Sequence, residues 1–194
     1  PSDLERSMDI ILAGRTCVVD CGLLNGGYFV NVVGIGFDAA VNHQSHAIAW
    51  PAGGLLRYVF ALIRTLGTYR SVRLKVTVDG DTREEDLFLL TIGNGTTCGG
   101  GFRLTPHAKL DDGVLDVTRV RPIRVLPLLW HLPKVFRGTL DRVARYVSMT
   151  TARTIRVECS DRVPVHVDGE IYRGDISAME IENLPKALTV IGKF

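Results

Sequence analysis

Two carboxylates flank a single glycine in the segment VPVHVDGEIYRGD, residues 163–175. The alternating VPVHV predicts a strand, and Asp168-Gly169 is a favoured two-residue turn into a second strand. Such a turn needs at most one acidic residue, yet Glu170 follows at once. One carboxylate could hold a metal ion through water while its neighbour accepts a proton from a hydroxyl group. Taken alone, however, the segment is better explained as a simple turn.

A second acidic segment is HAKLDDGVLD, residues 107–116, where Asp111, Asp112 and Asp116 lie close to Gly113. Short oxygen-rich loops bind hard cations such as Mg²⁺ or Ca²⁺, and backbone carbonyl groups complete the coordination shell. The spacing is not that of an EF-hand, because the terminal glutamate of that motif is absent. A surface Asp-Gly turn before a strand accounts for the same residues, so both interpretations stay open.

Two glycine-rich segments fit nucleotide-binding motifs poorly. NVVGIGFDAAVN contains a GxGxxA pattern, but the parallel βαβ context of a dinucleotide site is not evident. GNGTTCGGGF, residues 93–102, lacks the lysine and serine that end a P-loop. Glycines at these places also serve tight packing, bulges and turns.

The elements that would position these residues are mostly short strands. Helical spacing predicts a helix over residues 3–13 that stops at Gly14, and a second helical region over 38–66, interrupted near 51–54. Residues 122–140 predict one or two short helices broken at their prolines. The predicted strands are 17–25, 28–38, 72–78, 87–92, 112–120, 151–161, 163–170, 177–184 and 187–194. This pattern indicates a mainly β (α+β) fold, an antiparallel β-sandwich with two helical insertions.

Composition limits the functional classes. The 194 residues fit one domain, 46% are hydrophobic, and the net charge of +2 gives no reason to expect a nucleic-acid partner. No apolar run reaches the length of a membrane span, and the chain does not begin with a signal peptide. Four irregularly spaced cysteines are expected to be reduced thiols. We therefore expect a cytoplasmic protein.

Read in order, three strings carry a resemblance: FVNVVGIGFDAAV, then TIGNGTTCGGGFRLTPHAKLDDGVLDV, then VPVHVDGE. Together they resemble the C-terminal domain of the diacylglycerol kinase and sphingosine kinase-type lipid kinase family, above all its soluble bacterial members. The resemblance covers residues 1–194. It implies the C-terminal β-sandwich of a NAD kinase/diacylglycerol kinase-like fold, whose N-terminal ATP-binding domain, with its G-G-D-G-T string, is absent from this chain.

The resemblance also implies an activity. Such kinases transfer the γ-phosphoryl group of ATP to the hydroxyl of diacylglycerol or a related lipid, with Mg²⁺. By motif, Glu170 would be the base that accepts the proton of the lipid hydroxyl, and Asp168 would help to hold Mg²⁺ through water. Gly169 would bend the turn at the cofactor. We expect the fragment alone to be inactive.

Two further sites are implied by the resemblance. A structural Mg²⁺ would take backbone carbonyl oxygens from Lys109 and Val114 and the carboxylate of Asp112. Phe37 and Asp38 would border the lipid pocket. Apolar residues of the following helical region could line a lipid channel, namely Ile48, Trp50, Leu55, Leu56, Phe60 and Ile63.

The expected partners are ATP, a lipid acceptor such as diacylglycerol, and the membrane surface through peripheral contact; a homodimer is also open. Two alternatives remain at this point. One is a NAD kinase-like enzyme that phosphorylates a soluble hydroxyl, which a polar pocket beside Asp168 would favour. The other is a lipid-binding module without catalysis. The sequence does not indicate which lipid is used.

Overall fold

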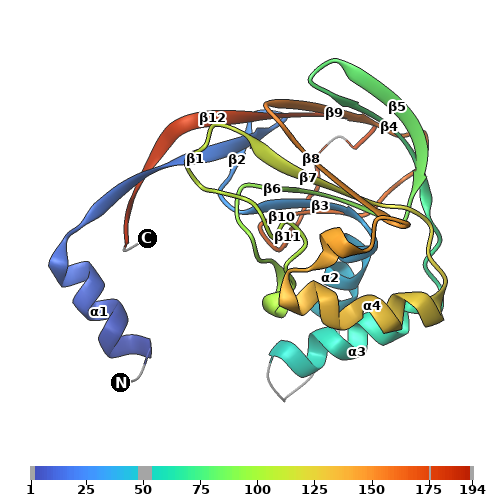
Figure 1. Ribbon diagram of the computed structural model, residues 1–194, viewed down its shortest axis with the longest axis horizontal. Helices are drawn as coiled ribbons and strands as arrows, with labels where there is room; N and C mark the ends of the chain where they lie inside the picture. Colours follow the sequence, from blue (N-terminus) through green and yellow to red (C-terminus); the bar gives the residue numbers. More distant parts are fainter. Residues whose placement is uncertain (1–2, 48–53, 175, 193–194) are drawn as a thin grey trace.

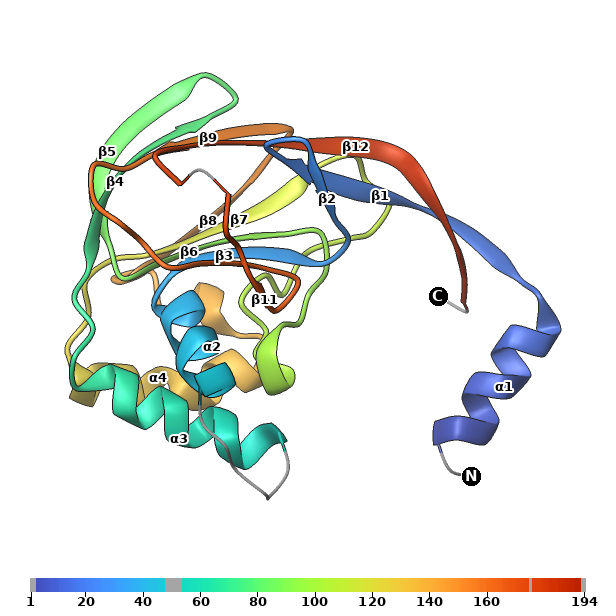
Figure 2. The same cartoon turned by 180° about the vertical axis from the view of Figure 1, so that it is seen from behind.

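The computed structural model describes residues 3–47, 54–174 and 176–192, which form two stacked sheets with helices against one of them (Figures 1 and 2). The helices are α1 (Asp3–Ala13), α2 (Phe37–Ala47), α3 (Gly54–Leu66) and α4 (Val125–Arg137), with short 3₁₀ turns at Gly99–Gly101 and Leu140–Arg142. The strands are β1 (Thr16–Leu24), β2 (Gly27–Phe29), β3 (Val32–Gly36), β4 (Val72–Val78), β5 (Asp81–Leu87), β6 (Leu89–Gly93), β7 (Leu115–Val120), β8 (Val147–Ala152), β9 (Thr154–Glu158), β10 (Val165–Val167), β11 (Glu170–Ile171) and β12 (Ala178–Ile191).

Both sheets have six strands, and every neighbouring pair is antiparallel. The outer sheet has the order β2-β1-β12-β9-β4-β5, and the middle sheet has the order β11-β10-β3-β6-β7-β8. The main hydrophobic core lies between them, with Leu74 and Met179 from the outer sheet facing residues such as Ile35 and Leu90 from the middle sheet. The predicted antiparallel β-sandwich is confirmed.

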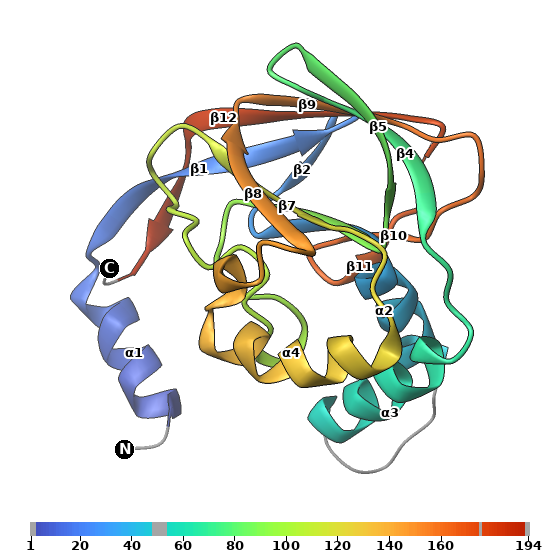
Figure 3. The same ribbon diagram turned by 45° about the vertical axis from the view of Figure 1, so that its right-hand side comes forward.

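The middle sheet is covered on its second face by α2, α3 and α4 (Figure 3). A second core forms there, in which Phe37, Leu62 and Val135 from the helices meet Leu89 and Val120 from the strands. All residues of β3, β6 and β7 are consequently buried. This burial on two faces explains why β3 and β6 are nearly continuous apolar runs. Strand β7 keeps an alternating pattern although it is buried as well, and it buries Asp116, Thr118 and Arg119.

Local turn signals were read correctly. Helix α1 ends at Ala13, and Gly14 follows with φ of 61°. The expected two-residue turn Asp168-Gly169 joins β10 to β11, and Asn25-Gly26 and Asp79-Gly80 form turns of the same length between β1 and β2 and between β4 and β5. Their first residues, Asn25, Asp79 and Asp168, all adopt positive φ, as type I′ turns require.

Two of the predicted strands are divided between the two sheets. Residues 28–38 were expected to form one strand, but the chain breaks after Phe29, so that β2 joins the outer sheet and β3 the middle sheet. The predicted return strand over 87–92 was also misplaced. The residues that pair with β4 are those of β5, an exposed edge strand rich in charged side chains. The next strand, β6, crosses to the middle sheet and pairs with β3.

The later elements need smaller corrections. Helix α4 runs without a break through Pro127 and Pro133. Pro127 lies in the first turn, where no backbone N–H partner is needed, whereas Pro133 lies inside the helix. The predicted strand over 151–161 divides at Arg153 into β8 and β9, and the last two predicted strands form one long β12.

Helix α1 stands apart from the sandwich, beside the end of β12 (Figures 1 and 2). Its apolar side chains Leu4, Met8, Ile11 and Leu12 are exposed. In the part of the chain that the structure covers, no helix has the length and apolar character needed to cross a membrane. All four cysteines are free thiols.

Candidate active site

The Asp168-Gly169 turn is anchored by the side chain of Asp168 itself. Its Oδ1 accepts the backbone N–H groups of Asn31 at 3.0 Å and Val32 at 2.7 Å, and its Oδ2 accepts that of Val30 at 2.8 Å. The backbone N–H of Asp168 donates to the carbonyl of Val32 at 2.8 Å. One carboxylate therefore holds the loop between β2 and β3 against the tip of the hairpin.

The same device occurs at the other Asp-Gly turn. The Asp79 carboxylate accepts backbone N–H groups from Arg153 at 3.0 Å and Thr154 at 2.9 Å, at the break between β8 and β9. Burial raises the pKa of Asp79, but these N–H groups, the Thr154 hydroxyl and the Arg153 charge outweigh it and lower the pKa below 3.8. Asp168 thus has a scaffold function that its sequence context did not reveal.

A buried polar pair lies beneath the turn. The Gly169 N–H donates to Nδ1 of His166 at 3.4 Å, and Nε2 of His166 lies 3.4 Å from the Asp38 carboxylate. With Nδ1 accepting, the ring proton belongs on Nε2, directed at Asp38. Thr91 adds its hydroxyl to the same carboxylate at 3.4 Å. A Cβ on Gly34 of β3 would overlap both the imidazole and the carboxylate, so the pair fits only over glycine.

Helix α2 holds the hairpin through successive turns. Asp38 lies in its first turn, where Oδ1 accepts the Ala39 N–H at 2.9 Å. One turn later, Nδ2 of Asn42 donates to the carbonyl of Gly169 at 2.8 Å. His43 follows, with Nε2 3.2 Å from the Val165 carbonyl. Both backbone polar groups of Gly169 are therefore engaged by protein, which fixes the turn before any ligand arrives.

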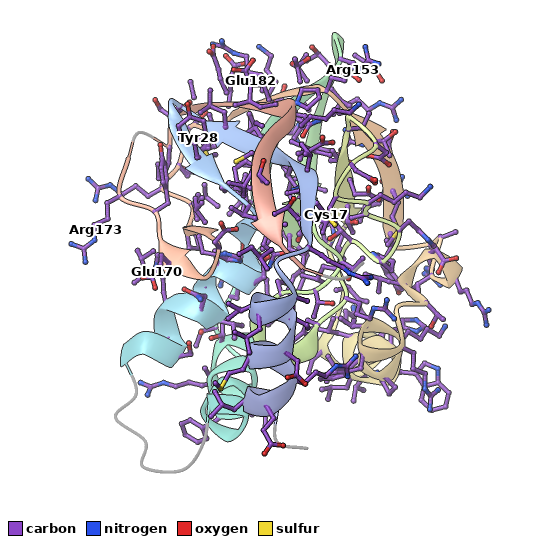
Figure 4. The ribbon with its side chains drawn as sticks, turned by 90° about the vertical axis from the view of Figure 1, so that its left-hand side faces the viewer. Cys17, Tyr28, Arg153, Glu170, Arg173 and Glu182 are labelled. Carbon is purple, nitrogen blue, oxygen red and sulfur yellow. The ribbon has the colours of Figure 1, made fainter. Side chains whose placement is uncertain are left out.

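Glu170 is left with its carboxylate exposed at the first position of β11 (Figure 4). Among the described residues, its side chain has no hydrogen-bond or ion-pair partner. Its backbone is held by pairing with Val167 and by the anchored turn before it. A carboxylate on such a rigid support can accept a proton from a hydroxyl group placed beside it. The structure thus gives Asp168 and Glu170 different environments.

The glycine-rich GNG loop supports the other side of the β2–β3 loop. The carbonyl of Asn31 accepts the N–H groups of Asn94 at 2.8 Å and Gly95 at 3.1 Å, and Nδ2 of Asn31 donates to the Thr97 carbonyl at 2.9 Å. A Cβ on Gly95 would overlap the Asn31 side chain. Close packing therefore accounts for these glycines.

The predicted cation loop is tied to the sandwich by a buried aspartate that sequence reasoning missed. Asp20, at a bulge in β1, accepts the N–H of Gly113 at 2.7 Å and that of Lys186 at 2.8 Å. The loop itself is open, with Lys109 and Asp112 exposed and Oδ1 of Asp112 3.3 Å from the Val114 nitrogen. The one sequence feature that could have predicted this role is the presence of a charged residue, Asp20, within an otherwise mostly apolar strand.

Charge is concentrated beside that loop. Burial first, and then the negative charge of Asp112, raise the pKa of Asp116 to about 6, while His107 lowers it. A cation near Asp112 would relieve this repulsion. No group of three or more His, Cys, Asp or Glu side chains is placed to hold a metal within residues 3–47, 54–174 and 176–192. The predicted site therefore depends on one carboxylate and backbone carbonyl groups.

The structure describes only some of the residues predicted for the lipid pocket and channel. Phe37 is buried and stacks on Phe88, with ring centroids 4.4 Å apart, while Asp38 belongs to the His166 pair. Phe60 and Ile63 are exposed on α3. The remaining predicted channel residues lie outside the described residues or have side chains that are not described, namely Ile48, Trp50, Leu55 and Leu56. The lipid channel stays a prediction.

Comparison with known proteins supports this architecture. A diacylglycerol kinase of Mycobacterium tuberculosis is 35% identical over 197 aligned residues, which cover 96% of this chain and 61% of the relative. One of Staphylococcus carnosus is 24% identical, covering 92% and 58%. The chain thus spans about three fifths of the length of these curated relatives.

Solved structures of related proteins have the same fold as this chain. A candidate diacylglycerol kinase from Bacillus anthracis superposes with a TM-score of 0.75 at 25% identity, covering all of this chain and 62% of that one. An NAD kinase from Archaeoglobus fulgidus shares the fold alone, with a TM-score of 0.51 at 11% identity over 96% of this chain and 59% of that one.

Residues 31–192 match the family described as the YegS C-terminal NAD kinase beta sandwich-like domain. This range holds the β2–β3 loop, helix α2, the cation loop and the β10–β11 hairpin. With a match over most of the chain and a relative at 35% identity, the protein belongs to this lipid kinase family.

Proposed function

We propose that this chain is the acceptor-side domain of an ATP-dependent lipid kinase, which transfers the γ-phosphoryl group of ATP to the hydroxyl of diacylglycerol or a related lipid. The relatives named diacylglycerol kinase support the reaction class. Because the chain spans about three fifths of their length, most of the ATP contacts would come from a partner domain. The single observation that carries the proposal is the environment of Glu170.

Glu170 is the base in this proposal. Phosphoryl transfer asks the protein mainly for positioning and for neutralisation of charge. The turn before Glu170 is fixed by Asp168, by Asn42 and by His166, while the Glu170 carboxylate itself is exposed. It therefore accepts the proton of the acceptor hydroxyl as the new bond to phosphorus forms.

Asp168 has capacity for a second role. Its Oδ2 accepts one backbone N–H, from Val30, and a carboxylate oxygen offers two lone-pair directions. Asp168 would hold Mg²⁺ through water on that free side. Mg²⁺, when bound, offsets the negative charge of the phosphates. Gly169 contributes only its conformation, since its N–H and carbonyl are used by His166 and Asn42.

A second Mg²⁺ would have a structural role in the loop of residues 109–114. The carbonyl oxygens of Lys109 and Val114 and the carboxylate of Asp112 form an oxygen donor set of the kind that hard cations prefer. Burial is the larger cause of the raised pKa of Asp116, and the negative charge of Asp112 adds to it; a cation bound at Asp112 would offset this second contribution. The bound ion would stabilise the loop that Asp20 already ties to β1.

The test is Glu170→Gln in a full-length protein carrying this domain, assayed with ATP, Mg²⁺ and diacylglycerol. We expect kcat to fall on the order of 10²-fold or more, as for loss of a general base. Asp81→Asn is the matched control, because Asp81 follows the Asp79-Gly80 turn as Glu170 follows its own, and it should leave kcat unchanged. Near-full activity of Glu170→Gln excludes it as the base. Turnover of a soluble dinucleotide in place of the lipid would point to NAD kinase-like chemistry.

A further inference from the structure

Helix α4 is apolar on two opposite faces. Leu128, Leu132 and Val135 recur at helical spacing and pack into the core beneath the middle sheet. A second stripe at the same spacing points away from that core, formed by Leu126, Leu129, Trp130 and Pro133. Phe136, one turn further, is partly exposed and packs its ring on the core residue Phe102. Leu126 is 80% exposed and Trp130 is 79% exposed. A helix that is apolar all round is normally buried, so this outer face is suited to a second apolar surface.

The surroundings of this face are strongly basic. Residues 121–146 contain six cations and one anion, a net charge of +5, whereas the whole chain carries +2. The other residues together are therefore net negative, at −3. The cations lie on both sides of the exposed stripe in the sequence, at Arg121, Arg124, Lys134, Arg137, Arg142 and Arg145. All are exposed except Lys134, which is half-buried. The modest net charge of the whole chain hides this asymmetry.

We infer that α4 and its flanking arginines form a docking surface for an anionic membrane, which the α4 face enters at the level of the lipid head groups. Trp and Leu side chains beside Lys and Arg are the combination that binds at this depth. Cations near an anionic leaflet each contribute roughly a fivefold gain in partitioning. Helix α3 lies next to α4 in the ribbon views (Figures 1 and 3). Its side chain Ile63 is also exposed.

The surface around α4 differs in charge from helix α1, the other helix with exposed apolar side chains. Helix α1 also exposes Met8 and Leu12, but residues 3–15 carry three anions and two cations. An anionic membrane would not favour that segment. Helix α1 therefore supplies a control within the same chain. The inference goes beyond the proposed reaction and requires neither ATP nor turnover.

The experiment measures binding of the purified chain to vesicles of phosphatidylcholine, with and without phosphatidylglycerol, by sedimentation. We expect binding only to the anionic vesicles, and weaker binding at high salt. The double substitution Leu126→Ser and Trp130→Ser should lower the partition coefficient at least tenfold. Arg121→Gln together with Arg124→Gln should lower it by roughly 25-fold.

Fluorescence gives a second readout of the same event. The chain has two tryptophans, so a Trp50→Phe background reports on Trp130 alone. Its emission should shift to the blue when anionic vesicles are added. The control pair Met8→Ser and Leu12→Ser on α1 should leave partitioning and the shift unchanged, and unaltered thermal unfolding of each variant confirms that the fold is intact.

Several results would overturn the inference. Equal binding to neutral and anionic vesicles would remove the charge argument. Unchanged partitioning of the α4 variants, or an equal loss in the α1 control, would place the contact elsewhere. A blue shift of Trp130 that follows protein concentration without vesicles would identify a second copy of the chain as the occupant. None of these results bears on Glu170, whose test is turnover.

Discussion

Replacing Asp168 by asparagine should destabilise the fold, because it weakens the hydrogen bonds that hold the β2–β3 loop. The carboxylate accepts three backbone N–H groups, from Val30, Asn31 and Val32. An amide can keep its oxygen on the two N–H groups now bound by Oδ1. Its nitrogen then faces the N–H of Val30, donor against donor, and that bond is lost.

The magnitude follows from these three bonds. Two of them change from charge-assisted to neutral, which costs about 1 kcal/mol each, and the third is lost at about 1.5–3 kcal/mol. Water can replace part of the third bond, because Val30 is 42% exposed. The net loss should then be about 2–3 kcal/mol of unfolding free energy, or roughly 5–10 °C in melting temperature for a chain of this length.

Differential scanning calorimetry at neutral pH measures this loss. Asp79→Asn is the matched control for the scaffold effect, since Asp79 holds Arg153 and Thr154 in the same way, and it should cost a similar amount. Activity in the full-length protein then separates the anchoring role of Asp168 from its proposed role toward Mg²⁺. Only Asp168→Asn should lower kcat at temperatures where both variants are folded. A melting temperature within 1 °C of the parent would refute the anchoring argument, and equal kcat values would refute the role toward Mg²⁺.

Three further predictions follow from the same contacts. Gly34→Ala should cost about 1–3 kcal/mol, because its Cβ would overlap the buried imidazole and carboxylate, whereas Gly27→Ala has room and should cost little; equal melting temperatures of the two variants would contradict this. Because the pKa of Asp79 is lowered in the folded state, its carboxylate stabilises the fold above pH 3.8, and this stabilisation is lost as the pH falls through the folded-state pKa. The difference in melting temperature between the parent protein and Asp79→Asn should therefore shrink in acid. A difference that stays constant with pH would contradict the ionised hydrogen-bond acceptor role of Asp79. Mg²⁺ at about a hundredfold excess over its Kd should stabilise the chain by about 2.7 kcal/mol, and Asp112→Ala should abolish this gain while Asp111→Ala keeps it; an equal gain in both variants would argue against the site.

The sequence predicted what local chemistry decides. Asp168-Gly169 specifies a two-residue turn, and this turn forms between β10 and β11, as do turns of the same length at Asn25-Gly26 and Asp79-Gly80. Glycine after an amphipathic segment ended α1 where expected. These signals act over a few residues, so no knowledge of distant partners was needed. The same holds for the sandwich class, which follows from many short strands.

The assignment of strands to sheets could not be predicted in this way. Leu87 ends β5 in the outer sheet and Leu89 begins β6 in the middle sheet, two residues apart, and both are buried. An apolar pattern shows that a residue is buried but not in which layer. The break between β2 and β3 had the same cause, because the N–H groups of Val30–Val32 turn toward a carboxylate far along the chain.

The paired carboxylates at the hairpin tip now have a physical explanation. Asp79 and Asp168 show that an Asp-Gly turn in this fold uses its aspartate to hold a neighbouring strand end, so the aspartate by itself does not mark an active site. What differs is the next position and its support. Asp81 and Glu170 both lie on edge strands, but Asp81 forms an ion pair with Arg83. Glu170 follows a turn held from three directions and keeps an exposed carboxylate that has no such partner among the described residues. Its proposed role as a base depends on this combination of rigid backbone and exposed acid.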